Sequence, residues 1–304
     1  MAEISGVLII NKGRGMTSHD VVAKVRKILH TKKVGHTGTL DPDASGVLPV
    51  CIGKATKIAQ FLLSTDKEYD ATLTFGVRTD SQDSTGKIVS EVKKLNFTEE
   101  EVRDAFSKFA GEIQQIPPMV SAIRYKGVRL YKLAREGKEI ERAPRKIRIF
   151  ELEITDYQFP NVRFNVACSK GTYIRTLCAD IGDTLGCGAH QSRLMRTKSG
   201  PFKLSDSITL EELTKMPDPE KKIIPIDIAL SHLPSLKVRN WMKELIKKNS
   251  LLPTLDTDEC FPKLQKGDLL RINSSKGNLL AIAAIETITP TGNTVKILKL
   301  FTGN

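Results

Sequence analysis

One loop of the sequence places an acidic residue between features that restrict the backbone. Residues 35–49 read GHTGTLDPDASGVLP, with three glycines and with Asp41 directly before Pro42. Glycine lets a backbone approach a ligand closely, and the proline restricts its own backbone and that of Asp41. Two interpretations fit this spacing. Asp41 is either a functional carboxylate on a rigid support or the residue that caps its own backbone in an ordinary Asp-Pro turn.

A second carboxylate, Asp43, lies two positions further along the same loop. Two carboxylates that flank one bond could hydrolyse a glycoside. A spacing of two residues with Pro42 between them does not guarantee that geometry, and a basic surface fits a neutral sugar poorly. The sequence therefore disfavours a glycoside hydrolase.

Other common chemical motifs are absent. Gly53-Lys54 lacks the remaining residues of a P-loop, and Gly13-Arg14-Gly15 lacks the third glycine of a dinucleotide fingerprint. Neither H-E-x-x-H nor G-x-S-x-G occurs. The five cysteines form no C-x-x-C pair, so we expect reduced thiols, no metal site and a cytoplasmic protein. No cofactor is expected.

The segments around the loop mix strand and helix patterns without a regular βαβ rhythm. Apolar runs at 6–10 and 47–52 predict buried strands, and an apolar stripe at helical spacing predicts a helix capped by Ser18. Further strands are expected at 69–77, 147–159 and 162–169, and further helices after Thr98 and at 172–185. Such a mixture favours an α+β fold over a doubly wound parallel sheet.

Positive charge is concentrated in one segment. The net charge is +12, from 47 Lys and Arg against 35 Asp and Glu. Residues 123–148 hold ten Lys or Arg against three Glu, a net charge of +7. Two interpretations fit this segment, a basic face that is only solvated and an arm that binds the phosphates of a nucleic acid. The concentration of charge favours the arm. No apolar run approaches the ~20 residues that cross a bilayer, and no secretion signal is visible, so no membrane partner is expected.

Several short motifs, in a fixed order, resemble the TruB family of tRNA pseudouridine synthases. The loop fills the pattern G-x-L-D-P-x-A-x-G-x-L-P from Gly38 to Pro49. The other matching segments are Asn11-Lys12-x-x-Gly15-x-Thr17-Ser18, Lys67-x-Tyr69, Gly171-Thr172-Tyr173-Ile174-Arg175-Thr176-Leu177, Gly186-Cys187-Gly188-Ala189-His190 and Leu194-x-Arg196. They extend from the N-terminus to about residue 200. The family usually has proline where this chain has Gly13, which affects the stiffness of that loop and not the chemistry.

The resemblance implies an enzyme that isomerises a uridine of tRNA, at position 55 of the T-loop, to pseudouridine. Asp41 would be the nucleophile, since a carboxylate can form and release a covalent intermediate. Arg175 would favour the charged form of Asp41. Tyr69 would stack on the target base and help to remove the C5 proton. The resemblance implies no cofactor, metal or redox step.

The resemblance also implies RNA contacts. His36 would enter the base stack where the uridine leaves it, because a base must be extruded to react and a planar ring replaces lost stacking. Leu194 would form part of the uracil pocket wall. Lys12 would support the loop or contact a phosphate. Asp83 would pair with Arg175 or another basic residue. The remaining expected contacts are Tyr173, Lys126 and Arg129, the last two on a mobile insertion at about 117–148 that closes on the T-arm.

The fold implied is α+β, a pseudouridine-synthase fold in which helices flank a mixed, mainly antiparallel sheet. We expect this catalytic domain at 1–230 and a small β-rich domain resembling PUA, an RNA-binding module, at 231–304. The T-arm stem-loop of tRNA is the expected partner of a monomer that requires no other protein. The alternative is a non-catalytic RNA-binding or RNA-chaperone protein. Asp41, Tyr69 and Arg175 together argue against it, because binding alone does not require a nucleophile.

Overall fold

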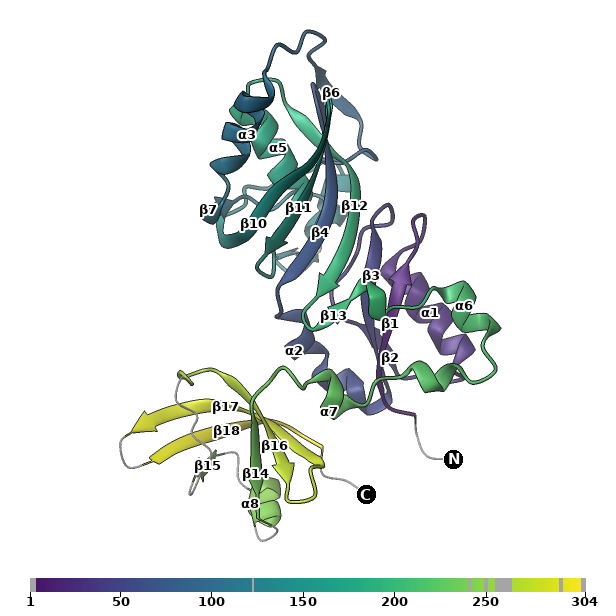
Figure 1. Ribbon diagram of the computed structural model, residues 1–304, viewed down its shortest axis with the longest axis vertical. Coiled ribbons are helices and arrows are strands. Elements are labelled where there is room, and N and C mark those ends of the chain that lie inside the picture. The colour runs from purple at the N-terminus through teal and green to yellow at the C-terminus, as the bar shows by residue number, and fades with distance from the viewer. Residues whose placement is uncertain are drawn as a thin grey trace.

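A computed structural model describes residues 4–121, 123–239, 242–248, 251–254, 264–289 and 292–301 (Figure 1). Its main feature is a nine-stranded sheet. The principal path has the order β1 (Gly6–Lys12), β3 (Ser45–Ile52), β12 (Ala189–Ser199), β4 (Lys67–Phe75), β11 (Asn161–Cys168), β10 (Arg145–Gln158) and β7 (Gly111–Gln115). In addition, β2 (Val34–His36) pairs with β3, and β13 (Phe202–Lys203) pairs with β12. Among the described strand pairs of this sheet, that of β3 with β12 is parallel and the others are antiparallel, so the mainly antiparallel α+β fold is confirmed.

Helices flank the sheet at two places (Figure 1). They are α1 (Ser18–Ile28), α2 (Ala59–Leu63), α3 (Glu99–Ser107), α5 (Ile174–Thr184), α6 (Leu210–Lys215) and α7 (Ile226–Ala229), with 3-10 turns at Gly53–Ile58, Leu204–Asp206 and Pro219–Lys222. α3 and α5 lie near β10 and β12, whereas α1 and α6 lie together near β1 and β2. The apolar stripe that predicted α1 is buried, including Val21, Val22 and Val25. Burial of such stripes against the sheet supplies most of the stability of short helices.

The start of α1 differs from the prediction that Ser18 caps it. Thr17 is the capping residue, because its hydroxyl accepts a hydrogen bond from the Asp20 N–H at 3.1 Å. The Asp20 carboxylate accepts one in return from the Thr17 N–H at 2.9 Å. This reciprocal pair satisfies two donors at the helix start. Ser18 is the first helical residue, and its hydroxyl is therefore available to another segment.

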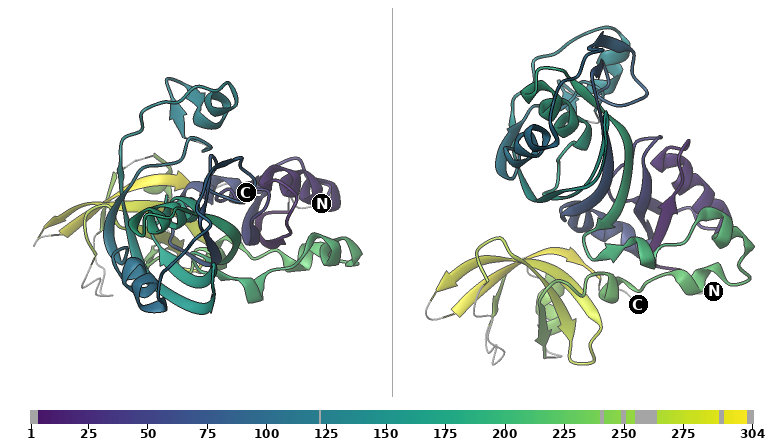
Figure 2. Two further views of the ribbon diagram at one scale, coloured as in Figure 1. Left: turned by 90° about the horizontal axis from the view of Figure 1, so that it is seen from above. Right: turned by 45° about the horizontal axis from the view of Figure 1, so that its top comes forward.

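Two segments of the chain extend away from the main sheet. β5 (Val77–Thr79) and β6 (Ile88–Glu91) form a hairpin whose turn contains Asp83. Between β7 and β10, β8 (Arg124–Tyr125), β9 (Val128–Arg129) and α4 (Leu130–Arg135) belong to the segment that we call the basic arm, residues 116–121 and 123–144. The left view of Figure 2 shows this arm standing away from the sheet on extended connections. The basic arm therefore projects from the sheet, whereas the last part of the predicted insertion does not: Arg145, Lys146 and Arg148 belong to β10 and pair with β7.

The C-terminal part forms a second sheet of five strands. Its order is β14 (Ser235–Val238), β16 (Leu269–Ser274), β17 (Leu279–Thr289), β18 (Gly292–Leu300) and β15 (Leu251–Thr254), and α8 (Met242–Lys248) follows β14. Val238 and Ile272 belong to a hydrophobic cluster within this part. A different cluster contains residues of both parts of the chain, among them Ile282 of β17 and Val7 and Ile9 of β1. The second sheet thus has its own core and also contributes to a cluster shared with the first part.

Four of the five cysteines lie in the described part of the chain. Cys51, Cys168, Cys178 and Cys187 are buried and free, and Cys260 lies outside the described residues. Burial raises the pKa of Cys51 and of Cys168 to about 12, so both thiols stay protonated at neutral pH. The described residues contain no metal-binding group of three or more His, Cys, Asp or Glu side chains. None of the described helices has the length and apolar character that a membrane crossing needs.

Candidate active site

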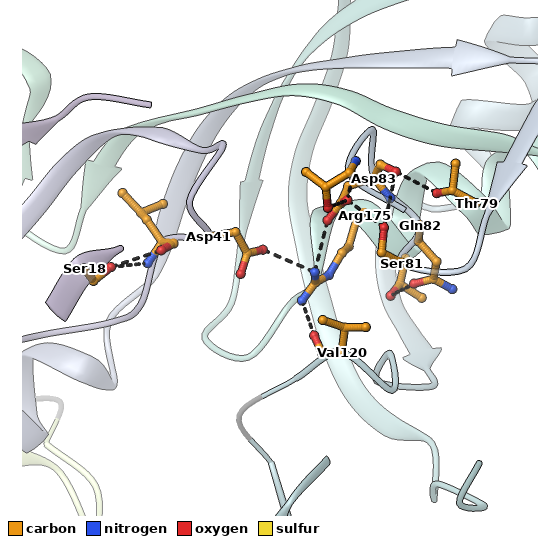
Figure 3. A network of polar contacts seen from close by, with 11 residues as sticks. Ser18, Asp41, Thr79, Ser81, Gln82, Asp83, Val120 and Arg175 are labelled. Carbon is orange, nitrogen blue, oxygen red and sulfur yellow. Dashed lines mark hydrogen bonds and ion pairs between the residues drawn. The ribbon is translucent and has the colours of Figure 1, made fainter. Parts of the chain in front are cut away.

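The loop between β2 and β3 is fixed on both sides of Asp41 (Figure 3). The Ser18 hydroxyl donates to the Leu40 carbonyl at 3.1 Å and accepts from the Leu40 N–H at 2.9 Å. The Gly15 N–H donates to the Pro42 carbonyl at 2.9 Å. The Asp41 carbonyl accepts from Ala44 in a turn, while the Asp41 side chain points to Arg175 and stays 43% exposed. An Asp-Pro turn is therefore present. The Asp41 carboxylate does not cap this turn and instead points towards Arg175.

Ser18→Ala is expected to lower the free energy of unfolding by about 1–3 kcal/mol, because both backbone groups of Leu40 lose their partner in a buried place. Urea unfolding of the variant and the wild type measures the change. Ser205→Ala, at an exposed serine, is the matched control and should stay within about 0.5 kcal/mol. Equal unfolding midpoints for Ser18→Ala and wild type would show that this hydroxyl does not fix the loop.

Lys12 also holds this loop in place, through hydrogen bonds of its ammonium group. Its side chain is fully buried, and its ammonium group donates to the carbonyls of Gly13 at 2.9 Å, Met16 at 2.8 Å and Pro42 at 3.1 Å. Burial lowers the pKa of Lys12 to about 8, while nearby carboxylates, Asp41 first, raise it. Three carbonyls occupy the three N–H donors. Of the two expected contacts, loop or phosphate, the structure contains the loop contact, and no donor is left for a phosphate.

Arg175 lies between two carboxylates (Figure 3). One guanidinium nitrogen, Nη1, is 3.4 Å from Asp41 Oδ2 and 3.2 Å from Asp83 Oδ2. The other, Nη2, donates to the Val120 carbonyl at the base of the basic arm at 2.6 Å. The Arg175 side chain is only 6% exposed. The structure thus brings Asp41, Asp83 and Arg175 together from three segments that are distant in the sequence.

The two carboxylates are held very differently. Oδ1 of Asp83 accepts from the Ser81 hydroxyl at 2.7 Å and from the Thr85 N–H and hydroxyl at 3.0 and 2.6 Å. Burial raises the pKa of Asp83, but these hydrogen bonds and the charge of Arg175 outweigh it and lower the pKa overall. Asp83 is therefore a fixed anchor for Arg175. Asp41 has the longer contact with Arg175 and the more exposed carboxylate, so its side chain is accessible from the cleft.

Asp41, Arg175 and four other expected site residues line one cleft of about 1240 Å³. Tyr69 comes from β4 and Leu194 from β12, and Tyr173 precedes α5, where its ring lies 5.8 Å from the Arg175 guanidinium carbon. Leu194 is buried and Tyr69 half-buried. Burial raises the pKa of Tyr69, so its phenol is neutral at pH 7. The cleft combines an apolar wall, an aromatic ring and an ion pair, and it suits a flat polar ring.

The other expected RNA contacts lie at or beyond the edge of the cleft. Arg129 of β9 lines it from the basic arm. Lys126 is exposed in the β8–β9 turn, with its ammonium 5.5 Å from the Tyr125 ring centre. His36 is half-buried at the end of β2, and burial lowers its pKa, so its imidazole is neutral at pH 7. None of these three contacts Asp41 directly in any described hydrogen bond or ion pair.

One cleft residue was not singled out from the sequence. Arg196 is 1% exposed and lines the cleft. Its Nε donates to the Val47 carbonyl at 2.7 Å, and its Nη2 donates to the Gly38 carbonyl at 3.1 Å. A signal was present, since Leu194-x-Arg196 is one of the motifs, but a lone arginine in a strand pattern gives no partner.

Comparisons with known proteins support the resemblance over most of the chain. The sequence model of the TruB family pseudouridylate synthase N-terminal domain matches residues 26–174, and that of the tRNA pseudouridylate synthase B C-terminal domain matches residues 175–231. A tRNA pseudouridine synthase B of Bacillus pumilus strain SAFR-032 is 48% identical over 288 residues, which cover 92% of each chain. The chain belongs to the TruB family.

Further relatives agree with this membership in the TruB family. The tRNA pseudouridine synthase B of Bacillus subtilis strain 168 is 43% identical over 289 residues and 92% of each chain. Among solved structures, a Cbf5-Nop10-Gar1 complex contains a chain that is 31% identical, with a TM-score of 0.77, covering 98% of this chain and 85% of that one. An H/ACA RNP bound to a substrate RNA containing 2′-deoxyuridine matches with a TM-score of 0.74 at 30% identity, over 98% of this chain and 85% of that one. The TruB-family chain is thus a pseudouridine synthase, a class that isomerises uridine.

Proposed function

We propose that this TruB-family chain converts the uridine at position 55 in the T-loop of tRNA to pseudouridine, with Asp41 as the nucleophile. The observation that carries the proposal is the pair formed by Asp41 and the buried Arg175 at the cleft. The carboxylate lies on a fixed backbone and remains exposed. Curated relatives of the chain are named tRNA pseudouridine synthase B.

The reaction rearranges one nucleotide without adding or removing atoms. The bond between N1 and C1′ breaks, the uracil rotates, C5 bonds to C1′, and the proton that leaves C5 is balanced by one gained at N1. Asp41 forms the covalent intermediate and is released from it. Tyr69 stacks on the base and helps to remove the C5 proton, and Leu194 closes the apolar side of the pocket. Because uridine and pseudouridine are isomers, the step needs no redox cofactor.

Arg175 and Asp83 act as a unit in this proposal. Arg175 orients the Asp41 carboxylate through their ion pair, and Asp83 holds the guanidinium in place from the other side. The contact of Arg175 with Val120 joins this unit to the base of the basic arm. Binding of RNA to the arm is therefore coupled in space to the group that orients the nucleophile.

The RNA contacts extend from the cleft onto the arm. Lys126 and Arg129 bind phosphates of the T-arm, and Tyr173 contacts the flipped nucleotide. His36 takes the place of the extruded base, and its neutral ring is suited to stacking. We assign catalysis to residues 1–230 and assign a PUA-like RNA-binding role to residues 231–304. The chain acts in the cytoplasm, as the four buried, free thiols favour, and needs no protein partner.

Affinity for tRNA is expected to fall steeply with salt, because basic side chains release counterions from the phosphates. Replacing Lys126 and Arg129 by Gln should make the plot of log affinity against log salt shallower by roughly 1 for each lost phosphate contact. Filter binding over a salt series measures the slope. Lys93→Gln with Lys94→Gln removes the same charge from two exposed lysines elsewhere and is the control. Equal slopes for the two double variants would mean that the arm does not contact the RNA backbone.

Single-turnover kinetics on an isolated T-arm stem-loop test the substrate assignment. With the purified chain in excess and no other protein, we expect pseudouridine at position 55 in both the hairpin and full tRNA, at similar rates. Proteins read RNA sequence mainly in single-stranded loops, so the hairpin holds the required information. A hairpin with cytidine at this position is the control.

The outcomes of this experiment separate two errors. A hairpin that stays unmodified at saturating enzyme, while full tRNA reacts, would show that recognition needs the whole tRNA. Full tRNA that stays unmodified at position 55 would refute the proposed function. In that case the same assay on other RNAs would distinguish a different target uridine from a protein that only binds RNA.

A further inference from the structure

Arg196 ties the two ends of the catalytic loop to one side chain. Its carbonyl partners, Gly38 and Val47, lie on opposite sides of the Asp41 turn. A planar guanidinium can hold two such acceptors at once, with less loss of freedom than a lysine. Arg196 therefore restricts the position of the whole segment that carries Asp41.

The strand of Arg196 also touches the loop through its backbone. Gly46 is opposite Arg196 in the parallel pairing of β3 with β12, and its φ is +102°. A Cβ added at Gly46 would lie 2.2 Å from the Arg196 carbonyl oxygen. Any other residue at this position would separate the loop from β12. One glycine of the sequence pattern is thus explained by close approach to Arg196.

The second neighbour of Arg196 is Tyr69, its partner in the antiparallel pairing of β12 with β4. Burial raises the pKa of the Tyr69 phenol, and the charge of Arg196 and a hydrogen bond with it act in the opposite direction. Arg196 therefore contacts two of the structures that supply groups to the cleft. The Asp41 loop lies on one side of it and Tyr69 on the other.

The charge of Arg196 has no counter-ion among the described residues. None of the ion pairs found there involves this guanidinium. A buried charge is costly unless it is paired, and methionine could occupy a similar volume without that cost. The unpaired cation instead lines the cleft, beside Tyr69, its partner on β4. Its charge therefore lies at the wall of the cleft.

We propose that Arg196 is a positioning residue of the isomerisation. It sets the separation of Asp41 and Tyr69 across the uracil pocket and gives the pocket wall a positive potential. This inference rests on the proposed function, because it assigns Arg196 to the same site. Loss of Arg196 should slow the reaction of bound RNA more than it weakens binding, since the assigned phosphate contacts lie on the arm.

The test compares Arg196→Met, Arg196→Lys and the control Arg193→Met, which changes an exposed arginine of the same strand. Single-turnover rates at saturating enzyme and the Kd for tRNA are measured for each. We expect Arg196→Met to react about 10²-fold more slowly, as a misplaced nucleophile does, with a Kd close to wild type. Arg196→Lys, which keeps the charge and loses the fork, should lie between Arg196→Met and wild type. Arg193→Met should keep the wild-type rate.

A spectroscopic measurement separates positioning from general stability. Ultraviolet titration of the phenols, with and without Tyr69→Phe, isolates Tyr69. Its titration should move to higher pH in Arg196→Met and should remain near wild type in Arg196→Lys. A general loss of packing does not predict this difference between the two variants.

The results that would overturn the proposal are defined for each variant. An Arg196→Met protein that reacts within about threefold of wild type would overturn it, and so would an unchanged Tyr69 titration. If Arg196→Met does not fold, Arg196→Lys decides, because a wild-type rate refutes the proposal and a reduced rate at wild-type Kd supports it. A wild-type chain that forms no pseudouridine refutes the proposed function itself. An active wild type with unaffected variants refutes only the role of Arg196.

Discussion

Asp41→Asn is expected to bind tRNA as wild type does and to form no pseudouridine. The amide keeps the shape of the carboxylate, and the loop is held by backbone contacts of Leu40 and Pro42, which the substitution leaves in place. It removes the proposed nucleophile, and loss of a covalent nucleophile lowers rates by at least about four orders of magnitude. Single-turnover assays and a binding titration with full tRNA measure the two effects separately.

Asp43→Asn is the matched control because it makes the same change two residues away on the same loop. Asp43 lines no part of the cleft that contains Asp41, so this variant should keep a rate within about threefold of wild type, as expected of a residue outside the reacting groups. Measurable turnover by purified Asp41→Asn would remove the nucleophile assignment. Equal and complete losses in both variants would instead revive a mechanism with two carboxylates.

Contacts that are local in the sequence were predictable, and some of them in detail. The motif of residues 38–49 predicted a rigid loop for Asp41. The helix predicted after Thr98 is also present, and it starts with a capping box of Thr98 and Glu101. The capping residue of α1 was predicted one residue late. Thr17 and Ser18 are both residue types that cap helices well. The choice depends on a contact 22 residues away, because the Ser18 hydroxyl is bonded to Leu40.

Contacts between distant segments were predictable only through the family resemblance, which implied the pair of Asp83 with Arg175. Asp83 and Arg175 are 92 residues apart, and Arg196 and Val47 are 149 apart. No periodicity or turn signal links residues at such distances, because the β-sheet pairing that joins them depends on the whole fold. The same reason hides the cluster that joins Ile282 to Val7. A sequence boundary near residue 230 gives no sign that residues on both sides of it share one hydrophobic cluster.

Arg175→Lys should be the second most damaging single change at the site. Lysine keeps the positive charge but carries it as a point charge on a flexible stem, whereas arginine presents a planar fork. The fork is used in three directions, towards Asp41, Asp83 and the Val120 carbonyl. An ammonium group cannot keep all three in this geometry, so the carboxylate of Asp41 loses its orientation. We expect a rate about 10²-fold below wild type at saturating enzyme, with little change in Kd for tRNA.

Arg78→Lys provides the control for the chemical change itself. Arg78 forms an ion pair with Asp183 at 2.6 Å, but both side chains are more than 40% exposed. Exposed pairs contribute little, about 0–1 kcal/mol, so this variant should react at nearly the wild-type rate. The buried fork and the exposed one thus make opposite predictions for the same substitution. An Arg175→Lys protein as active as Arg78→Lys would show that Asp41 needs only a nearby charge, and the orienting role assigned to Arg175 and its anchor Asp83 would be wrong.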